Sequence, residues 1–584
     1  MTGTDETTEA LLERVKAWID DDPEPGTADH LRKLWYAVED EGPEKAAAAE
    51  TDLRELFRAQ LEFGTAGLRG AVGPGPNRMN RAIVRRAAAG VGAWVRAAGT
   101  HRQGIVVARD ARHRSDDFVA DTIEVIAGAG IPVHVLPAPT PTPVLAFAVR
   151  HLGAAAGIMV TASHNPGTDN GYKVYDAEGR QIDGAQATAV AAEMVAVGLL
   201  SDLPISGFGN PLIENHGLEV VDAYLAAIGR VVAPKTNRAT VEAAYTPLHG
   251  VGGEVVRRAV DQSGFIHLHE AATQALADPD FPTVAFPNPE EPGALDHLID
   301  QASWIGADVA LANDPDADRL AMVVVDPQVG TARDAAAWHP LTGDQLGCLL
   351  ADHLVRRGGL PEGGIFATTI VSSTLLRQIA MAAGCGYVET LTGFKWLSRA
   401  ATPEHPLILA YEEAIGYCVG ETVRDKDGIS ALLLACEMIS DLVEQGLTVW
   451  DRLDDLCRRF GVHLTGQWSV RLEGGDGAAR IAEAMARLRA APPTALGSRP
   501  VAGVSDLAQG RPDRGLPPAD VVGIALPGAR VVVRPSGTEP KLKCYVEVVE
   551  AVPPGSDVAG ARTRAGEGLA EIVAALPAAL GLEQ

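Results

Sequence analysis

The chain has 584 residues, 46% of them hydrophobic, which is enough apolar material for roughly three to five domains with cores of their own. Its 50 basic and 76 acidic residues give a net charge of −26. This acidity argues against a nucleic acid or an anionic membrane as partner, so an anionic substrate has to be bound by a local basic cluster.

Residues 1–60 are predicted to form a helical extension. Apolar residues recur there at helical spacing until the turn-forming segment 22–26, whose sequence is Asp-Pro-Glu-Pro-Gly. The first apolar positions are Leu11, Leu12, Val15 and Trp18.

Strand–helix–strand patterns follow and occur three times. They begin at the apolar runs 104–108, 240–245 and 364–367, each of which leads into a helical pattern. Three units of similar plan predict three related α/β domains. The turn 250–253 lacks the G-x-G-x-x-G pattern, which argues against a dinucleotide-binding loop.

The C-terminal part has a different pattern. Two apolar runs, 531–534 and 542–548, flank a tight polar turn, and a closing helix is expected over 569–576. This arrangement predicts a small α+β domain. The segment 492–518 is rich in Pro and Gly and has the composition of a long, disordered loop.

The six cysteines are scattered, without a C-x-x-C spacing, and are predicted to be reduced thiols that form neither a disulfide framework nor a zinc site. The acidic N-terminal segment has no signal-peptide layout, and no apolar run reaches about 18 residues. We therefore expect a cytoplasmic location. The cysteines are Cys348, Cys385, Cys418, Cys436, Cys457 and Cys544.

The segment 161–166, Thr-Ala-Ser-His-Asn-Pro, is predicted to place a nucleophilic serine in an exposed turn. It follows the apolar run 157–160, so Ser163 is expected where a buried strand gives way to a loop, which is where open α/β sheets bind ligands. Lys173 closes the polar stretch after it and would return a cation to the same place.

Two other interpretations of Ser163 are turn formation and a Ser-His-Asp hydrolase. The G-x-S-x-G elbow of the α/β-hydrolases is absent, although other triads lack it too. Neighbouring side chains of an extended segment point apart, so His164 is not expected to serve as the base for Ser163.

The segment 314–319, Asp-Pro-Asp-Ala-Asp-Arg, is predicted to bind a metal ion. It joins two apolar runs and carries three carboxylates at alternate positions: Asp314, Asp316 and Asp318. Each like-charged pair at about 4 Å costs on the order of 1 kcal/mol in water and about 4 kcal/mol at an intermediate dielectric. A hard divalent cation relieves this repulsion, and oxygen ligands suit Mg²⁺.

An EF-hand does not fit this segment, because it needs Gly where Arg319 stands and Glu where Val325 stands. A solvated acidic turn is the remaining alternative. Three carboxylates do not fill an octahedral site, so a phosphate oxygen is an expected further ligand.

The segment 534–543, Arg-Pro-Ser-Gly-Thr-Glu-Pro-Lys-Leu-Lys, combines amides and hydroxyls with positive charge. These groups predict a phosphate cradle without a Walker motif, with a plain hairpin turn as the alternative. The cations are Arg534, Lys541 and Lys543.

Paired acids, Glu412 and Glu413, follow the apolar run 407–410 in the segment 411–417, Tyr-Glu-Glu-Ala-Ile-Gly-Tyr. Such carboxylates accept hydrogen bonds from vicinal hydroxyls, although acid pairs are more often surface features.

Together these four segments resemble those of the α-D-phosphohexomutase superfamily, the phosphoglucomutases and phosphomannomutases, from about residue 60 to the C-terminus. In this family the four are the phosphoserine, metal, phosphate and sugar loops. The segment 63–70, Phe-Gly-Thr-Ala-Gly-Leu-Arg-Gly, resembles the N-terminal active-site segment and implies that Arg69 lies beside the phosphoserine.

The resemblance implies a role for each matching residue. The catalytic group would be Ser163 as phosphoserine, Lys173 as general acid/base, Arg69, His164 and Lys426. One Mg²⁺ per chain would be held by Ser163, Asp314, Asp316 and Asp318. The substrate-binding residues would be Arg319, Gly393, Glu412, Ala414, Arg534, Ser536, Gly537, Thr538 and Lys543.

The resemblance also implies the fold, an α/β architecture of four domains around a central cleft. Three related α/β domains with mixed sheets and a smaller C-terminal α+β domain are expected after the helical extension. The expected boundaries are 1–60 for the extension, 61–233 with the phosphoserine loop, 234–338 with the metal loop, 339–460 with the sugar loop and 461–584 with the phosphate loop.

The sugar loop departs from the family pattern. Many members carry Gly-Glu-x-Ser there, whereas this chain keeps Glu412 but has Tyr411 and Ala414 at the flanking positions. Together with Asp425-Lys-Asp-Gly428 and Asn77-Arg-Met-Asn80, this form resembles the branch that includes phosphopentomutases and glucose-1,6-bisphosphate synthases as well as phosphoglucomutases.

The expected activity is the interconversion of sugar 1-phosphates and 6-phosphates through phosphorylated Ser163, with a sugar bisphosphate as intermediate and activator. The partners would be small sugar phosphates, and the protein would be a monomer or a homodimer. Phosphopentomutase activity or bisphosphate synthesis from an acyl phosphate is the near alternative. A metal-dependent phosphatase or a non-catalytic sugar-phosphate-binding protein is the remote one.

Overall fold

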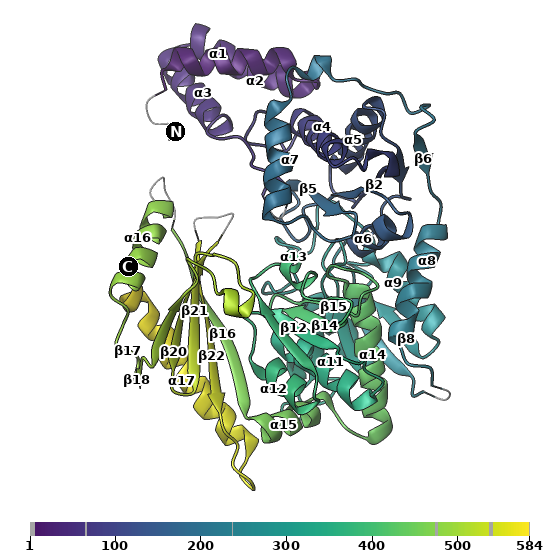
Figure 1. The fold of residues 1–584 in the computed structure, drawn as a ribbon, viewed down its shortest axis with the longest axis vertical. Coiled ribbons are helices and arrows are strands. Elements are labelled where there is room, and N and C mark those ends of the chain that lie inside the picture. The colour runs from purple at the N-terminus through teal and green to yellow at the C-terminus, as the bar shows by residue number, and fades with distance from the viewer. Residues whose placement is uncertain (1–5, 65–66, 236–237, 473–476, 537–540, 583–584) are drawn as a thin grey trace.

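The structure, a computed structural model, describes residues 6–64, 67–235, 238–472, 477–536 and 541–582. Three helices come first and lie together at the top of Figure 1. They are α1 (Thr8–Asp21), α2 (Pro25–Asp40) and α3 (Pro43–Leu56). Thr7 caps α1, and prolines open α2 and α3, where a missing backbone N–H costs little. The region is helical, as its apolar spacing predicts.

A six-stranded mixed sheet follows, in the order β1-β5-β4-β2-β3-β6. Strands β4, β2, β3 and β6 are parallel, whereas β5 is antiparallel to β1 and β4. The strands are β1 (Leu68–Ala71), β2 (Ile105–Arg109), β3 (Val133–Val135), β4 (Ala156–Val160), β5 (Asp169–Asp176) and β6 (Ile213–Asn215). The helices are α4 (Arg81–Ala97), α5 (Ser115–Gly128), α6 (Thr142–His151), α7 (Gly184–Ala196) and α8 (Glu219–Ile228). Every residue of β4 is buried, which explains its unbroken apolar sequence.

The second sheet has five strands in the order β11-β10-β9-β7-β8. They are β7 (Val241–Thr246), β8 (Ile266–Glu270), β9 (Val309–Ala312), β10 (Ala321–Val325) and β11 (Trp338–Pro340). Its helices are α9 (Gly252–Ser263) and α10 (Asp296–Ile305). Strands β8, β7 and β9 are parallel, and β10 is antiparallel to β9 and β11.

The third sheet has four strands in the order β13-β12-β14-β15. They are β12 (Ile365–Thr369), β13 (Gly386–Thr390), β14 (Leu407–Glu412) and β15 (Gly416–Val419). The helices of this part are α11 (Gly343–Arg357), α12 (Leu375–Ala382), α13 (Phe394–Leu397), α14 (Gly428–Gln445) and α15 (Val449–Phe460). Only β15 is antiparallel to its neighbour.

The three α/β sheets share one connection. In each, a parallel inner strand is followed by an antiparallel neighbour: β4 by β5, β9 by β10, and β14 by β15. The linking segments are residues 161–168, 313–320 and 413–415. All three therefore occupy the same position in their sheets, at the carboxyl end of a buried strand, where open α/β sheets bind ligands.

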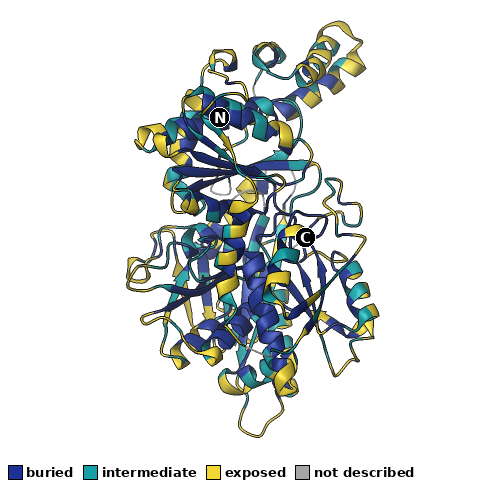
Figure 2. Cartoon of the chain, turned by 90° about the vertical axis from the view of Figure 1, so that its right-hand side faces the viewer, coloured by how far each residue is buried: buried dark blue, intermediate teal, exposed yellow. Residues whose placement is uncertain are grey.

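The largest apolar core joins the second and third sheets through α14 and also includes α6 and α8. Residues 428–440 of α14 are buried in an unbroken run, as expected for a helix that is covered on all sides. The strands are mostly buried and the exposed residues lie on the outer helices and loops (Figure 2). Among the described helices, none combines the length and the hydropathy needed to cross a membrane.

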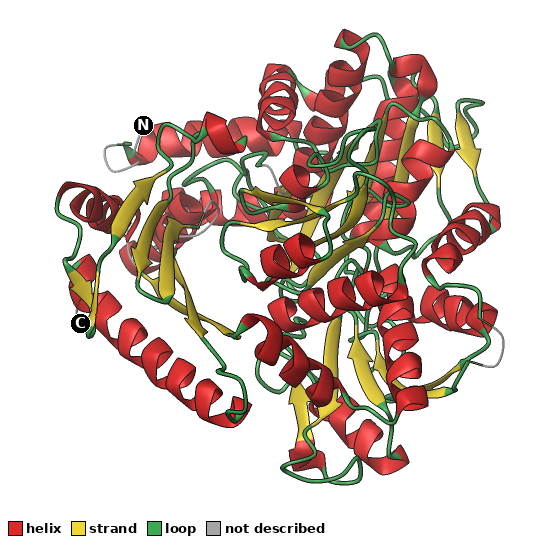
Figure 3. Cartoon of the chain, turned by 60° about the horizontal axis from the view of Figure 1, so that its bottom comes forward, coloured by secondary structure: helices red, strands yellow, loops and turns green. Residues whose placement is uncertain are grey.

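The C-terminal part is an antiparallel sheet in the order β16-β22-β21-β20-β19, against which the long helix α17 packs (Figure 3). Its strands are β16 (Val462–Arg471), β19 (Gly503–Asp506), β20 (Val522–Leu526), β21 (Ala529–Pro535) and β22 (Lys541–Glu550). Its helices are α16 (Gly477–Ala490) and α17 (Val558–Leu580). The fold is thus the predicted one: three α/β units with mixed sheets and a smaller α+β unit.

The prediction of a disordered loop over 492–518 is wrong. This segment contains β17 (Ala495–Leu496), β18 (Arg499–Pro500) and β19, followed by a short 3-10 turn. Leu496, Leu507 and Leu516 are buried and tie it to the rest of the sheet. Turn residues dominate its composition because its strands are short, and the few apolar anchors between them are too widely spaced to form a periodic pattern.

Candidate functional site

The three equivalent loops meet at one place. The Ser163 hydroxyl, on the β4–β5 loop, donates a hydrogen bond of 3.0 Å to Asp314 Oδ2 on the β9–β10 loop. Arg319 Nη1, at the end of that second loop, donates to the carbonyl oxygen of Ala414 on the β14–β15 loop at 3.0 Å. The sequence motifs that are far apart in the chain therefore form one site.

Ser163 has a left-handed backbone, with φ of 54°, and only 2% of it is exposed. A residue with a Cβ pays about 1–2 kcal/mol for this conformation. The loop holds it in place, because the amide of Ser163 donates to Thr161 Oγ1 at 2.9 Å. The result is a serine hydroxyl aimed at the acidic loop instead of at solvent.

His164 lies close to that hydroxyl, since its Nδ1 is 3.3 Å from Ser163 Oγ. The expectation that the two side chains point apart is wrong, because it assumed an extended backbone and Ser163 is left-handed. Burial lowers the pKa of His164 well below its usual value, and the nearby Arg319 and Arg69 lower it further. The imidazole is therefore neutral near pH 7 and has a ring nitrogen that can accept a proton.

Arg112 holds the serine loop and was not identified from the sequence. Its two terminal nitrogens donate to four backbone carbonyls at 2.6–3.1 Å, and the side chain is almost fully buried. Those carbonyls belong to Ser163, Asn165, Pro166 and Asp169. The one available signal was its position just beyond β2, at the ligand-binding end of the sheet.

Substituting Arg112 with lysine is expected to lower kcat about 100-fold with little change in KM, because one ammonium group cannot keep four carbonyls in place and a small shift of the Ser163 hydroxyl is costly if it is the reacting group. Steady-state kinetics with a sugar phosphate measure this. Arg109→Lys is the matched control, since Arg109 pairs with the exposed Asp116 nearby. Parent-like turnover of both variants would contradict the positioning role of Arg112.

The acidic loop has the geometry of a metal site. Ligand oxygens of Asp314, Asp316 and Asp318 lie within 4.8 Å of one another, and all three residues are fully buried. Ala317, with φ of 59°, reverses the chain between them. One oxygen each of Asp316 and Asp318 has no hydrogen-bond partner among the described residues. Buried, unpartnered carboxylate oxygens fit a hard cation such as Mg²⁺.

Lys173 neutralises part of this acidic cluster. It lies on β5 opposite Met159, and its Nζ donates to Asp316 Oδ2 at 2.6 Å and to Asp318 Oδ2 at 2.9 Å. Burial raises the pKa of Asp314 well above its usual value, and the two neighbouring carboxylates raise it further. Burial would also raise the pKa of Asp316, but the charge of Lys173 together with the hydrogen bonds from Lys173 and Thr142 outweighs burial and holds that pKa low.

Three more cations surround the cluster. Lys426 Nζ is 3.2 Å from Asp318 Oδ2; burial acts to lower the pKa of Lys426, but Asp318 and Asp425 together raise it. Burial lowers the pKa of Arg69, and Asp316 and Asp318 oppose that shift. Nε of Arg69 has no hydrogen-bond partner within the described part of the chain. Together with Arg319, these side chains form the local basic cluster that an anionic substrate needs.

The sugar-loop residues predicted from sequence also come together. Glu412 Oε1 accepts a hydrogen bond of 2.6 Å from the backbone N–H of Gly393. Ala414 contributes its carbonyl to Arg319. Tyr411 is instead fully buried under the loop, where its hydroxyl donates to Asp344 at 3.0 Å. Tyr411 therefore supports the loop from below.

The fourth loop is only partly described. Gly537 and Thr538 lie outside the described residues. Arg534 and Lys543 are opposite each other on β21 and β22, and the amide of Ser536 donates to Lys541 O at 2.7 Å. Burial and the charge of Lys541 lower the pKa of Lys543, while Glu413 and Glu290 oppose that shift. Lys543 thus lies near acids of the second and third units.

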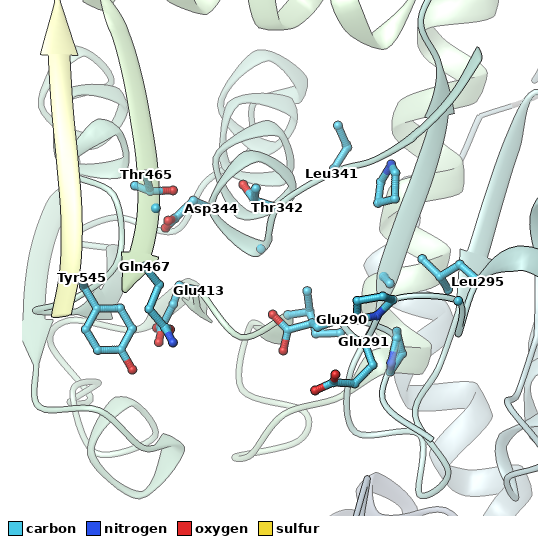
Figure 4. Close-up of a pocket in the computed structure, with 18 of the residues that line it drawn as sticks. Glu290, Glu291, Leu295, Leu341, Thr342, Asp344, Glu413, Thr465, Gln467 and Tyr545 are labelled. Carbon is cyan, nitrogen blue, oxygen red and sulfur yellow. The ribbon is translucent and has the colours of Figure 1, made fainter. Parts of the chain in front are cut away.

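A cavity of about 470 Å³ lies between the second, third and fourth sheets, next to these acids. Figure 4 shows Glu413 beside Tyr545 and Gln467 on one side of it, and Glu290 and Glu291 on the other. Glu290 also lies 3.7 Å from Arg319, so the cavity adjoins the metal loop. Burial, reinforced by Glu412 and Asp344, raises the pKa of Glu413 to about 7.

Replacing Glu413 with glutamine is expected to stabilise the chain increasingly as the pH rises. The folded protein holds this proton up to about pH 7, whereas an unfolded glutamate releases it near pH 4.5, so the parent loses stability between these values. Urea unfolding at pH 5 and pH 8 measures the difference. The exposed Glu362→Gln serves as the control, and an equal response of both variants to pH would contradict the prediction.

Comparison with known proteins gives consistent matches along the chain. Four phosphoglucomutase/phosphomannomutase models match: α/β/α domain I at residues 60–198, domain II at 222–328, domain III at 342–460 and the C-terminal domain at 470–552.

Three curated relatives cover most of both chains. "Probable phosphomannomutase" of Haemophilus influenzae is 39% identical over 82% of this chain and 95% of its own. "Probable phosphoribomutase" of Schizosaccharomyces pombe is 33% identical over 92% and 93%. "Phosphoglucomutase" of Staphylococcus aureus is 32% identical over 86% and 92%.

Among solved structures, a phosphoglucomutase/phosphomannomutase family protein from Burkholderia thailandensis has the same fold. It covers 89% of this chain and 98% of its own, with a TM-score of 0.65 and 21% identity.

Proposed function

Because the chain belongs to the phosphoglucomutase/phosphomannomutase family and is a phosphohexomutase, we propose that its phosphoryl transfer passes through Ser163. One observation carries the proposal: the Ser163 hydroxyl lies 3.0 Å from Asp314, within the acidic loop, and 3.3 Å from a neutral imidazole. In this cycle Ser163 carries a phosphoryl group and gives it to a free hydroxyl of a sugar monophosphate. It then recovers the other phosphoryl group from the resulting bisphosphate.

The family depends on Mg²⁺, and the acidic loop offers it a fitting set of oxygens. Asp314, Asp316 and Asp318 would hold one ion, which would offset negative charge on the phosphoryl oxygens when bound. Arg69 and Arg319 place fixed positive charge around the same point, which favours the transfer without reorganisation.

Proton transfer is assigned to Lys173, with Lys426 as the second group. Both ammonium groups contact Asp318, from the first and third units respectively. As a neutral amine, such a lysine accepts the proton of the sugar hydroxyl that attacks the phosphoryl group, and as an ammonium it donates a proton to the sugar oxygen that loses one. His164 accepts the proton of the Ser163 hydroxyl as that oxygen attacks a phosphoryl group of the bisphosphate, and returns it when the phosphoryl group leaves Ser163.

The sugar is held at the other side of the site. Glu412, anchored to the Gly393 amide, accepts hydrogen bonds from vicinal hydroxyls, and Ala414 leaves room beside them. The distal phosphate is bound by Arg534, Ser536, Gly537, Thr538 and Lys543 of the fourth loop. A separate phosphate cradle lets the bisphosphate bind in either orientation, so that one set of catalytic groups serves both halves of the reaction.

Hexose phosphates are the proposed substrates, since the relatives named for a hexose include the one at 39% identity. Pentose phosphates are the second candidate. The relative named for ribose covers 92% of this chain, and the serine of the common sugar loop is replaced here by Ala414.

A panel of 1-phosphates of glucose, mannose, ribose and deoxyribose tests the function, with Mg²⁺ and a trace of the matching bisphosphate. We expect isomerisation of a hexose phosphate at the highest rate, without steady release of inorganic phosphate. Faster turnover of a pentose would reverse the ranking. Steady phosphate release would indicate a phosphatase, and bisphosphate formation from an acyl phosphate would indicate a synthase.

A further inference from the structure

A second group of potential metal ligands lies on the first sheet, away from the catalytic loops. His134 on β3 faces Glu214 on the edge strand β6, and His216 follows β6 directly. Strand β6 is visible at the edge of the upper unit in Figure 1. It lies three strand positions from β4, or about 14 Å at the usual strand spacing. Within the described residues, this group and the acidic loop are the only two whose ligand atoms meet within 4.8 Å.

The three ligand atoms fit one cation. His134 Nδ1 lies 3.1 Å from His216 Nε2 and 3.2 Å from Glu214 Oε2, and the third separation, His216 Nε2 to Glu214 Oε2, is 3.9 Å. A triangle with these sides has a circumscribed circle of radius about 2.0 Å, which equals the usual length of a zinc–nitrogen or zinc–oxygen bond. One point is therefore at bonding distance from all three atoms.

The other ring nitrogen of His216 contacts a carboxylate, as the second ring nitrogen of a metal-bound histidine commonly does. His216 Nδ1 lies 3.4 Å from Glu219 Oε1, and that carboxylate oxygen accepts the amide of Gly217 at 2.9 Å. Metal-bound histidines commonly donate their second ring N–H to a carboxylate, which fixes the ring and the tautomer. His216 thus presents Nε2, without its proton, to the point shared with His134 and Glu214.

Hydrogen bonding alone accounts for this cluster less well. A single N–H at His134 Nδ1 can donate a well-aligned hydrogen bond to His216 Nε2 or to Glu214 Oε2, but not to both. The chain contains a contrasting group in which hydrogen bonds suffice. His267 and His269 each contact a different oxygen of Glu242, at 2.8 and 2.7 Å. In that group every imidazole has an acceptor of its own, whereas in the β3–β6 group three atoms converge on a single point.

We propose that His134, Glu214 and His216 bind one divalent transition-metal ion of the Zn²⁺, Co²⁺ or Ni²⁺ type. Imidazole nitrogens select these ions over Mg²⁺, which prefers an all-oxygen set. The ion clamps the short edge strand β6 onto β3. The Glu214 side chain is 64% exposed, so the remaining coordination positions face solvent and take water. This bound ion is separate from the Mg²⁺ loop, and it stabilises the folded chain.

Calorimetric titration of the full chain with Zn²⁺ in saturating Mg²⁺, which competes with Zn²⁺ for the acidic loop, tests this site. We expect one Zn²⁺ per chain at this site and at least about 100-fold weaker binding in His216→Ala. Glu219→Gln, which removes only the outer carboxylate, is expected to weaken binding about 10–100-fold. His267→Ala is the matched control and should bind like the parent.

Co²⁺ provides a second readout that does not depend on the alanine variant folding. Its visible spectrum in the parent should show the bands of nitrogen ligation, and Glu214→Gln, at an exposed position, should change them. Zn²⁺ should also raise the melting temperature of the parent more than that of Glu214→Gln. The proposal would be overturned if the parent bound no Zn²⁺ saturably. It would also be overturned if the number of Zn²⁺ ions bound per chain were the same in the parent, His216→Ala and Glu214→Gln.

Discussion

Replacing Ser163 with alanine is expected to reduce kcat by a factor on the order of 10⁴ or more, the range seen when a catalytic nucleophile is removed. The hydroxyl is the group that faces both the acidic loop and the neutral imidazole, at 3.0 and 3.3 Å. The coupled assay of sugar-phosphate isomerisation measures the loss. Binding of the sugar phosphate should persist, because the phosphate and sugar loops are unchanged.

Ser440→Ala is the matched control for this experiment. It also removes a buried serine hydroxyl, but one near the C-terminal end of α14, which donates to the carbonyl of Ala239. If Ser440→Ala keeps the activity of the parent and Ser163→Ala loses it, the loss is due to the hydroxyl of Ser163 and not to the removal of a buried serine in general. A Ser163→Ala protein that isomerises at the parent rate would exclude a phosphoserine mechanism.

Replacing Lys173 with methionine is expected to lower both activity and stability. The variant keeps an unbranched side chain that is one atom shorter, but leaves Asp316 and Asp318 without the ammonium that contacts both. Breaking a buried ion pair in this way costs about 3–5 kcal/mol. Loss of the proton-transferring group should lower kcat by about 10²–10⁴-fold.

The stability loss should depend on Mg²⁺. Urea unfolding in EDTA should show the full difference from the parent, and added Mg²⁺ should reduce it, because the ion replaces the missing positive charge between the carboxylates. Lys45→Met, which removes an exposed ion pair with Glu41, is the control and should change stability by at most about 1 kcal/mol. If Lys173→Met unfolds like Lys45→Met in both buffers, the charge balance described for the site is wrong.

The acidic loop illustrates what a sequence reveals well. Asp314, Asp316 and Asp318 alternate in a short connection between two apolar runs, and such spacing leaves few ways to keep three carboxylates apart. Their convergence, and the nearby ammonium of Lys173, follow from local spacing and strand pairing. The strands and helices around them were also predictable, because their apolar residues recur at the spacing of a strand or a helix.

Contacts made through the backbone were not predictable. Arg112 binds carbonyl groups, which every residue has, and so its targets leave no trace in the sequence. The left-handed turn at Ser163 is equally hidden, because serine has no marked preference for it, and this turn decides where His164 points. In segment 492–518 the turn residues outnumber the few buried leucines that organise it.

The equivalent position of the three loops explains how one site draws on three units. Each unit supplies residues where a buried parallel strand passes to its antiparallel neighbour: Ser163, the three carboxylates of the acidic loop, and Glu412 at the end of β14. A tight connection at a rigid strand end fixes a side chain more precisely than a long loop does. The relative placement of the units then sets the 3.0 Å contacts between loops.

The most direct test of the account is a single-turnover experiment with enzyme whose phosphoryl group carries a radioactive label. The account predicts that peptide mapping finds the label on Ser163, and that mixing with unlabelled sugar monophosphate and Mg²⁺ moves it into sugar bisphosphate within one turnover. Label that stays on the protein, maps to another residue or appears as inorganic phosphate would contradict it.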